Sequence, residues 1–376
     1  MNFLTLKDIP LGSKKVLMRV DFNVPMDKKG HITDDSRIRA ALPSILWVLD
    51  QGGSLILMSH LGRPKGVDPA LSLKPCADRL SELLGKVVRL ISRPDEVGGL
   101  KPGEVVLLEN LRFNPAEENP EKDPEFTKNL AKLADIYVDD AFGSAHRPHS
   151  SITEVPKYFG KNKAAGFLLE KEISFLGAVL TNPERPFVSI VGGAKISTKI
   201  GVLEALARKA DKVLIGGAMA YTLLKAKGFK VGSSLVEEGA SLPKGNFILP
   251  IDFVCEKEGE IQIFSVKEGI PDGFKGMDIG PESIELFKNE IKGTKTLFWN
   301  GPLGVFEDDR FAEGTNKVAK AIAQLSAITI IGGGDTVSAL EKSGLANQIT
   351  HLSTGGGASL EYIELGSLPG IDILKL

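Results

Sequence analysis

The chain has 376 residues, which is too many for one ordinary hydrophobic core, so we expect two domains. With 42% hydrophobic residues, 25% charged residues and a formal net charge of -2, its composition is typical of a soluble globular protein and argues against a nucleic-acid partner. No apolar run reaches the ~18 residues of a membrane span, and the N-terminus lacks a signal-peptide pattern. Two distant cysteines, Cys76 and Cys255, favour buried thiols and a cytoplasmic location.

The first predicted strand, Lys15–Val20, runs into alternating polar residues. Arg19, Asp21 and Asn23 follow one another with period two, so they can share one face at the end of the strand. A strand that simply ends in a polar loop is the alternative, but a binding role is the better interpretation. A helix follows, capped by residues 34–36, with Arg37 and Arg39 in its first turn. Cations there oppose the helix dipole unless an anion binds, although Arg39 can equally be a solvated side chain.

Basic residues also follow the later predicted strands of the first half. Strand 54–58 leads to His60 and Arg63, strand 104–108 leads to Arg112, and strand 135–139 leads to His146, Arg147 and His149. Helices are predicted at 73–84 and 126–133, and the acidic cluster at 117–125 is interpreted as a solvated loop and helix start. In a doubly wound sheet the strand ends share one edge, so these residues predict a pocket for a small polyanion.

An amphipathic helix at 167–180, stopped by Asn182 and Pro183, separates the two halves, and we place the domain connection there. The second half opens with strand 187–191 and two glycines, followed by Lys195 and Lys199. Four residues apart at a predicted helix start, the two lysines can share a face and meet nucleotide phosphates. Solvated surface lysines are the alternative. Neither a Walker A loop nor a Gly-x-Gly-x-x-Gly turn is present.

Glycine-rich strand ends recur through the second half. A strand is predicted at 246–253, a helix start at 276–282, and a further strand at 296–299 that leads into residues 300–307. Strand 327–331 leads into Gly332, Gly333, Gly334, Asp335 and Thr336 at a helix start, which suits a phosphate or a metal-bound phosphate as well as a simple capped turn. Residues 354–359 repeat the pattern. Several such turns in one half indicate a nucleotide-sized site.

Eight motifs together resemble the phosphoglycerate kinase family. They are RVDFNVP (19–25), SHLGRP (59–64), ENLRF (109–113), DAFGSAHR (140–147), GGAK (192–195), WNGP (299–302), GGGDT (332–336) and STGGGAS (353–359). They occur in family order along nearly the whole chain. The resemblance implies an α/β fold of two Rossmann-like lobes with parallel sheets flanked by helices, joined by a long helix and facing an open cleft.

The resemblance also implies domains and substrates. The N-terminal domain, residues 1–166 with a returning segment 360–376, would bind 3-phosphoglycerate or 1,3-bisphosphoglycerate. Residues 167–183 would be the linking helix, and residues 184–359 would bind ATP or ADP with Mg²⁺. We expect small-molecule substrates only, no nucleic acid, no membrane and a monomer.

Site residues carried over by motif fall into groups. The phosphoglycerate would be held by Asp21, Asn23, Arg37, His60, Arg63, Arg112 and Arg147. The nucleotide would be held by Lys195, Lys199, Gly276, Asn300, Glu307, Gly332, Gly333, Gly334, Asp335 and Thr336, with Asp335 directed to Mg²⁺. Arg37 and Lys195, aided by N–H groups of Gly355, Gly356 and Gly357, would stabilise the transferring phosphoryl group.

The chain departs from the family pattern at a few places. It is short between residues 91 and 104 and between 232 and 250, where a longer helical crossover is usual, and Asp139 stands where Asn is common. Two other functions were weighed. A nicotinamide-dependent dehydrogenase needs the glycine turn that is missing here. A non-catalytic anion-binding protein would not need the lysines and the acidic residue of the second half.

Overall fold

The computed structural model describes residues 2–376 and divides into two units. The first unit runs to Ser174 and also includes the C-terminal segment Ser367–Leu376. The second unit is Phe175–Gly366. The division falls inside helix α4 (Phe167–Thr181), within the predicted linking helix. Residues 360–366, which we expected in the returning segment, group with the second unit, because α10 (Gly356–Leu365) packs against α5 (Ile200–Lys209).

The first unit is built on a six-stranded sheet with every adjacent pair parallel, in the order β3-β4-β2-β1-β5-β6. The central strands are buried along their length because helices and helical turns cover both faces. The strands are β1 (Lys15–Val20), β2 (Ser54–Met58), β3 (Val88–Ile91), β4 (Val105–Leu108), β5 (Ile136–Asp140) and β6 (Lys163–Ala165). The predicted strands of this half are confirmed to within a residue or two.

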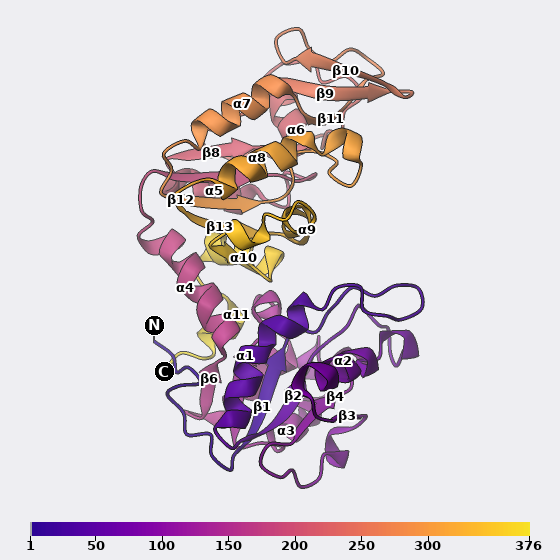
Figure 1. The fold of residues 1–376 in the computed structure, drawn as a ribbon, viewed down its shortest axis with the longest axis vertical. Helices are drawn as coiled ribbons and strands as arrows, with labels where there is room; N and C mark the ends of the chain where they lie inside the picture. Colours follow the sequence, from indigo (N-terminus) through magenta and orange to yellow (C-terminus); the bar gives the residue numbers. More distant parts are fainter. Residues whose placement is uncertain (1) are drawn as a thin grey trace. The chain divides into compact units, whose positions relative to one another are not determined.

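Helices α1 (Ser36–Asp50) and α2 (Lys74–Leu84) lie against one face of this sheet (Figure 1). Their apolar sides share a core with the alternate β1 residues Val16, Met18 and Val20. The intervening residue Arg19 therefore faces the opposite side of the sheet. Other helical segments of the unit are α3 (Pro124–Ala131), α11 (Pro369–Asp372) and the short turns η1 (Pro69–Leu71), η2 (Pro94–Glu96), η3 (Leu111–Phe113), η4 (Pro120–Lys122), η5 (Phe142–Ser144), η6 (Ser150–Glu154) and η7 (Val155–Phe159).

Helix α3 begins two residues before the predicted start at 126. The Asp123 side chain accepts hydrogen bonds from the backbone N–H groups of Glu125 (3.2 Å) and Phe126 (3.3 Å), and Pro124 occupies the first helical position. Proline is well suited to that position because its missing N–H would have no partner inside the helix. The cap moves the helix start toward the N-terminus.

The second unit holds a five-stranded parallel sheet in the order β14-β13-β12-β7-β8. Its strands are β7 (Phe187–Val191), β8 (Lys212–Ile215), β12 (Thr296–Asn300), β13 (Ile328–Gly332) and β14 (His351–Leu352). Its helical segments, besides α5 and α10, are α6 (Met219–Ala226), α7 (Pro281–Glu290), α8 (Glu313–Ala323), α9 (Gly334–Lys342), η8 (Asp309–Phe311) and η9 (Ala346–Gln348). The predicted α/β class with parallel sheets flanked by helices is confirmed.

The second unit also holds a small antiparallel sheet, whose antiparallel pairing was not predicted. It has the order β10-β9-β11 and consists of β9 (Asp252–Lys257), β10 (Glu260–Ser265) and β11 (Lys275–Ile279) (Figure 1). The predicted strand 246–253 is wrong in its extent, because Pro250 lacks an N–H, and Ile248 makes only one bridge, to Leu214. The helix start predicted within 276–282 is confirmed by α7, which begins at Pro281, although Gly276 itself lies in β11.

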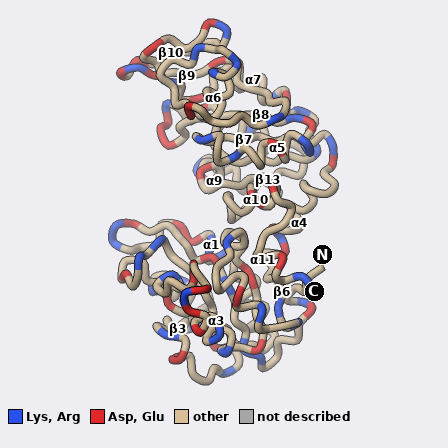
Figure 2. The backbone as a smooth tube through the Cα atoms, turned by 180° about the vertical axis from the view of Figure 1, so that it is seen from behind, with Lys and Arg blue, Asp and Glu red and all other residues tan. Residues whose placement is uncertain are grey.

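The segment between α6 and β9 contains no helix in the described chain, in keeping with its shortness. Among residues 2–376, no helix combines the length and the apolar character needed to cross a bilayer. Acidic and basic residues are interspersed along the backbone of each unit (Figure 2).

Asp140 joins the first sheet to helix α4. It lies at the end of β5, and its Oδ1 accepts hydrogen bonds from the N–H groups of Leu168 (2.8 Å) and Leu169 (3.2 Å). The side chain is fully buried, and its Oδ2 has no hydrogen-bond partner. Burial raises the pKa of Asp140 to about 7, and the helix N–H groups only partly oppose this rise.

The first prediction is a pH dependence of stability that arises from Asp140. The unfolded chain releases this proton near pH ~4, whereas the folded chain keeps it to about 7. The folded state therefore binds more protons over that interval, so this group lowers the free energy of unfolding as pH rises through it. Asp140→Asn should flatten that slope in denaturant titrations at pH 4.5 to 7.5. Asp123→Asn, an exposed cap, controls for loss of a capping charge, and an unchanged slope in Asp140→Asn would contradict the assignment.

Candidate functional site

Basic side chains gather at the carboxyl ends of the parallel strands in the first unit. Arg37, at the start of α1, places its Nη1 2.6 Å from Oδ2 of Asp21, which follows β1. Arg112, in η3 after β4, donates from Nη1 to the carbonyl of Gly62 at 2.7 Å. Asn23 accepts a hydrogen bond from the N–H of Gly62 at 2.9 Å, so it fixes the loop after β2 beside the arginines.

The remaining predicted residues of this group lie in the same place. The pKa of Arg112 is lowered by burial and by nearby positive charges that include Arg63. The charge of Arg147 adds to the forces that depress the pKa of His149. The structure thus brings together all seven side chains that the sequence predicted for phosphoglycerate, although their roles in binding stay a prediction.

The histidines of this cluster are held neutral. Burial, followed by the charges of Arg19, Arg112 and Arg37, keeps the pKa of His60 well below its usual range. Burial, followed by the charges of Arg112, Arg19 and Arg147, lowers the pKa of His149 to about 3, and burial with the adjacent Arg147 lowers that of His146 to about 4. Near neutral pH the positive charge of this edge therefore comes from guanidinium groups, and the imidazoles contribute hydrogen bonds.

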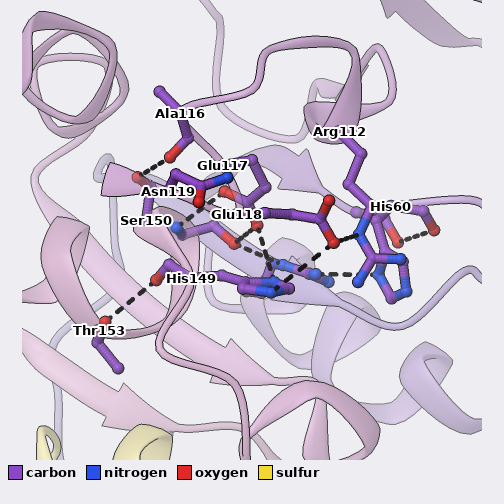
Figure 3. A network of polar contacts seen from close by, with 12 residues as sticks. His60, Arg112, Ala116, Glu117, Glu118, Asn119, His149, Ser150 and Thr153 are labelled. Carbon is purple, nitrogen blue, oxygen red and sulfur yellow. Dashed lines mark hydrogen bonds and ion pairs between the residues drawn. The ribbon is translucent and has the colours of Figure 1, made fainter. Parts of the chain in front are cut away.

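Two glutamates that the sequence suggested were solvated belong to this cluster. Glu118 lies 3.1 Å from Nε of Arg112, and Glu117 is completely buried (Figure 3). Both carboxylates also approach the ring of His149, at 3.9 Å from Glu117 and 4.0 Å from Glu118. The interpretation as a solvated residue was wrong for Glu117, whereas Glu118 is exposed as expected. Two adjacent glutamates in an acidic run carry no sequence signal that separates the buried residue from its neighbour.

The predicted turn at 332–336 lies beside a second helix start in the second unit. Gly333 has a φ of +92°, and a Cβ on Gly356 would come within 2.6 Å of the Gly333 Cα. Thr336 accepts a hydrogen bond from the N–H of Gly301 at 2.8 Å, and Asn300 donates to the carbonyl of Gly356 at 3.3 Å. The N-termini of α9 and α10 are therefore adjacent, and such helix starts favour anions.

Lys199 is a partly buried cation that lies beside this turn through its contact with Asn300. Its Nζ donates to the carbonyl of Gly192 at 2.8 Å and to Oδ1 of Asn300 at 3.4 Å. Burial lowers the pKa of Lys199 to about 8, and the carboxylate of Asp335 opposes this shift. The prediction that Lys199 and Lys195 share a helix face is wrong, because α5 begins only at Ile200 and both lysines precede it.

Three predicted nucleotide residues are less closely tied to the turn. Lys195 and Glu307 are exposed, and within residues 2–376 no hydrogen bond or ion pair joins their side chains to residues 332–336. Gly276 lies in β11, where it allows the close approach of Tyr221. No group of three or more metal-ligating side chains forms among the described residues. A divalent cation would therefore need oxygen ligands from a bound molecule besides Asp335.

The chain was compared with known proteins. The family model described as "Phosphoglycerate kinase" matches residues 6–365. The phosphoglycerate kinase of Thermosipho africanus is 51% identical over 396 aligned residues, covering 99% of this chain and 97% of the relative. Phosphoglycerate kinase 3, cytosolic, of Arabidopsis thaliana is 50% identical, covering 98% of this chain and 96% of the relative.

A solved structure gives the same result. The phosphoglycerate kinase of Coxiella burnetii has a TM-score of 0.87 and 38% sequence identity, covering 99% of this chain and 98% of the solved one. The resemblance inferred from the eight motifs is confirmed. Because the family model, the relatives and the solved structure all match over nearly the whole chain, this protein belongs to the phosphoglycerate kinase family.

Proposed function

We propose that the chain is a phosphotransferase that moves a phosphoryl group reversibly between 1,3-bisphosphoglycerate and ADP, giving 3-phosphoglycerate and ATP. The observation that carries this proposal is a pair of unlike anion sites, one in each unit. The first is an edge of guanidinium groups, and the second is a pair of adjacent glycine-led helix starts. Family membership over nearly the whole chain supports the same reaction. A coupled assay of ATP-dependent phosphorylation of 3-phosphoglycerate tests it.

The phosphoglycerate site is assigned to the first unit. Guanidinium forks match carboxylate and phosphate oxygens, so Arg37, Arg63, Arg112 and Arg147 are suited to the charged ends of this substrate. His60 and Asn23 add uncharged hydrogen-bonding groups, and Asp21 orients Arg37 through their ion pair. A polyanionic substrate would offset the mutual repulsion of the arginines, which gives the site its preference for such ligands.

The nucleotide site is assigned to the second unit. The N–H groups at the starts of α9 and α10, with Lys199 beside them, would hold the phosphates, and Lys195 would reach the transferring group. Asp335 is exposed at the first turn of α9, so it is free to bind Mg²⁺ that arrives with the phosphates. Mg²⁺ commonly binds in this way, through one or two carboxylates, water and substrate phosphates, and it would neutralise charge there.

The chemistry requires no general base. The acceptor is a carboxylate that is already ionised, so its oxygen attacks the γ-phosphorus as the bond to the β-phosphate oxygen breaks. Catalysis then rests on alignment and on charge stabilisation by Arg37, Lys195 and the N–H groups of residues 355–357. Because the two substrates bind to different units, the units must close on each other, which also excludes water from the acyl phosphate.

We also propose a monomer in the cytoplasm. Each proposed substrate site is assembled from residues of one chain, so catalysis needs no second copy. Cys76 and Cys255 are both buried and unpaired, which suits a reducing compartment.

The second prediction concerns the two charges assigned to transfer. Arg37→Ala and Lys195→Ala should each lower kcat by on the order of 10²–10³, the effect of removing one preorganised donor to a transition state. Arg39→Ala is a matched control for Arg37, because both lie in the first turn of α1 but Arg39 pairs with Asp35. Lys212→Ala, which removes a surface ion pair with Glu290, is the control for Lys195. Near-normal turnover in both test variants, with folding intact, would overturn the assigned roles.

The third prediction concerns the metal. Asp335→Asn should raise the Mg²⁺ concentration needed for half-maximal rate by roughly tenfold or more, because an amide oxygen is a weaker ligand than a carboxylate. The rate is measured across a magnesium titration at fixed ATP. Asp272→Asn, an exposed residue of the same unit, should follow the wild-type curve. Coincident curves for Asp335→Asn and the wild type would remove Asp335 from the metal site.

The fourth prediction concerns the contact between the two helix starts. Gly356→Ala places a Cβ against the Gly333 backbone, so the 332–336 turn must shift. We expect KM for ATP to rise about tenfold or more, while KM for 3-phosphoglycerate stays near normal. Gly99→Ala, whose Cβ would meet nothing within 4 Å, controls for the substitution itself. Equal effects on both KM values would contradict a nucleotide site at this turn.

A further inference from the structure

Arg19 is a completely buried guanidinium at the edge that carries the phosphoglycerate cluster, yet the proposed mechanism does not use it. All three of its nitrogens have partners inside the first unit. Nε donates to Oγ of Ser151 at 2.8 Å, Nη1 donates to the carbonyl of Val20, and Nη2 lies 3.1 Å from Nδ1 of His60. Arg19 therefore contacts a substrate residue while being itself withdrawn from solvent.

The contact with His60 fixes which ring nitrogen carries a proton. A guanidinium has donors only, so Nδ1 of His60 must accept the hydrogen bond with its lone pair. The proton of the neutral ring then resides on Nε2. An imidazolium at this position would direct a second N–H at the Arg19 N–H, which is both a donor–donor clash and a charge repulsion.

Glu117 supplies the buried counter-charge for Arg19. Its Oε1 accepts a hydrogen bond from Oγ of Ser151 at 2.6 Å, and its Oε2 accepts one from the Ser151 N–H at 3.0 Å. Because Ser151 gives its one hydroxyl proton to Glu117, its oxygen is free to accept from Arg19. The Tyr137 hydroxyl, which donates to the Ser151 carbonyl at 2.8 Å, holds this segment in place.

The charged groups around His60 come from several elements, and most of them lower the pKa of its imidazole. Arg19 on β1, Arg37 on α1 and Arg112 in η3 all disfavour a charged imidazole, and the His149 ring before η6 would add to this only if it were itself protonated. The carboxylates of Glu117 and Glu118 are committed to Ser151 and Arg112 respectively. Figure 3 shows His60 and Arg112 on one side of this network, with Glu117, Glu118 and His149 beside them.

We propose that Arg19 is a positioning residue which, anchored to Glu117 through Ser151, fixes His60 as a neutral imidazole that offers its Nε2–H to phosphoglycerate. This inference rests on the proposed function for the identity of the ligand only. His60 then recognises the substrate as a hydrogen-bond donor and not as a cation. The positive charge of the site consequently comes from its arginines and stays constant across the physiological pH range.

The direct test is nitrogen NMR of the full-length protein with ¹⁵N-labelled histidine. His60 is identified as the ring missing from the spectrum of His60→Gln. We expect an unprotonated Nδ1 and a protonated Nε2 at every pH from 5.5 to 8. A proton on Nδ1, or a ring that becomes charged within this interval, would overturn the proposal.

Neighbouring serines provide a matched pair of variants. Ser150 and Ser151 both lie in η6 and are both buried, but the Ser150 hydroxyl donates to the Ala116 carbonyl and has no contact with Arg19. Ser151→Ala should raise KM for 3-phosphoglycerate up to about tenfold with little change in kcat, and should weaken the His60 tautomer preference. Ser150→Ala should affect stability only. Identical behaviour of the two variants would indicate a merely structural role.

Arg19→Met removes both the donor and the charge. His60 should then titrate at a higher pH than in the wild type, although burial, Arg112 and Arg37 still lower its pKa, and KM for 3-phosphoglycerate should fall as pH decreases through this new titration. A KM that does not change with pH in this variant would contradict the proposal. If Arg19→Met does not fold, the wild-type spectrum and the Ser150→Ala and Ser151→Ala variants still test the proposal. Adding 3-phosphoglycerate to the labelled wild type should shift the His60 Nε2 signal. The expected tautomer without that shift would refute the substrate role of His60, not the Arg19 contact.

Discussion

Repulsion among the guanidinium groups at one edge of the first sheet is the constraint on which the first unit depends. Parallel strands end at this edge together, so they bring arginines that are far apart in the sequence close together in space. Carboxylates partly offset this repulsion: Asp21 forms an ion pair with Arg37, and Glu118 forms one with Arg112. The histidines between them stay neutral because burial, and then the neighbouring guanidinium charges, lower their pKa. A stable fold and an edge ready for an anion follow from the same arrangement.

In the second unit, the groups suited to an anion are mainly backbone N–H groups. The close approach of Gly356 to Gly333 leaves no room for a side chain, and it sets the free N–H groups of two helix starts side by side. A partly buried cation, Lys199, accompanies them, and its lowered pKa reflects the cost of burying it without a full counter-charge. Backbone dipoles suit a nucleotide that brings its own metal, whereas side-chain forks suit a small substrate with two charged ends.

Much of the molecule was predictable from its sequence. Apolar runs that end in glycine or in basic residues gave the strands of both parallel sheets, and the motifs gave the cluster from Asp21 to Arg147. The misses have physical causes. Pro250 interrupts a strand whose apolar pattern continues. The hairpin between β9 and β10 turns at Glu258 and Gly259, both with positive φ, but a single glycine between two partly charged strands was not recognised as a hairpin turn. The burial of Glu117 depends on Ser151, which lies 34 positions away, so local pattern could not separate it from Glu118. Lys195 and Lys199 were expected to share a helix face because they are four residues apart. This spacing does not show where the helix begins, and α5 begins only at Ile200.

The central claim is that each unit binds one substrate by its own means. Backbone amide NMR of the deuterated, ¹⁵N-labelled protein during separate titrations with 3-phosphoglycerate and with MgADP tests it most directly. The account predicts that 3-phosphoglycerate alone shifts signals at residues 21–23, 59–63, 110–113 and 146–149. MgADP alone should shift signals at residues 192–199, 300, 332–336 and 355–357. If both ligands first perturb the same unit, or if 3-phosphoglycerate leaves the arginine edge unchanged, the account is contradicted.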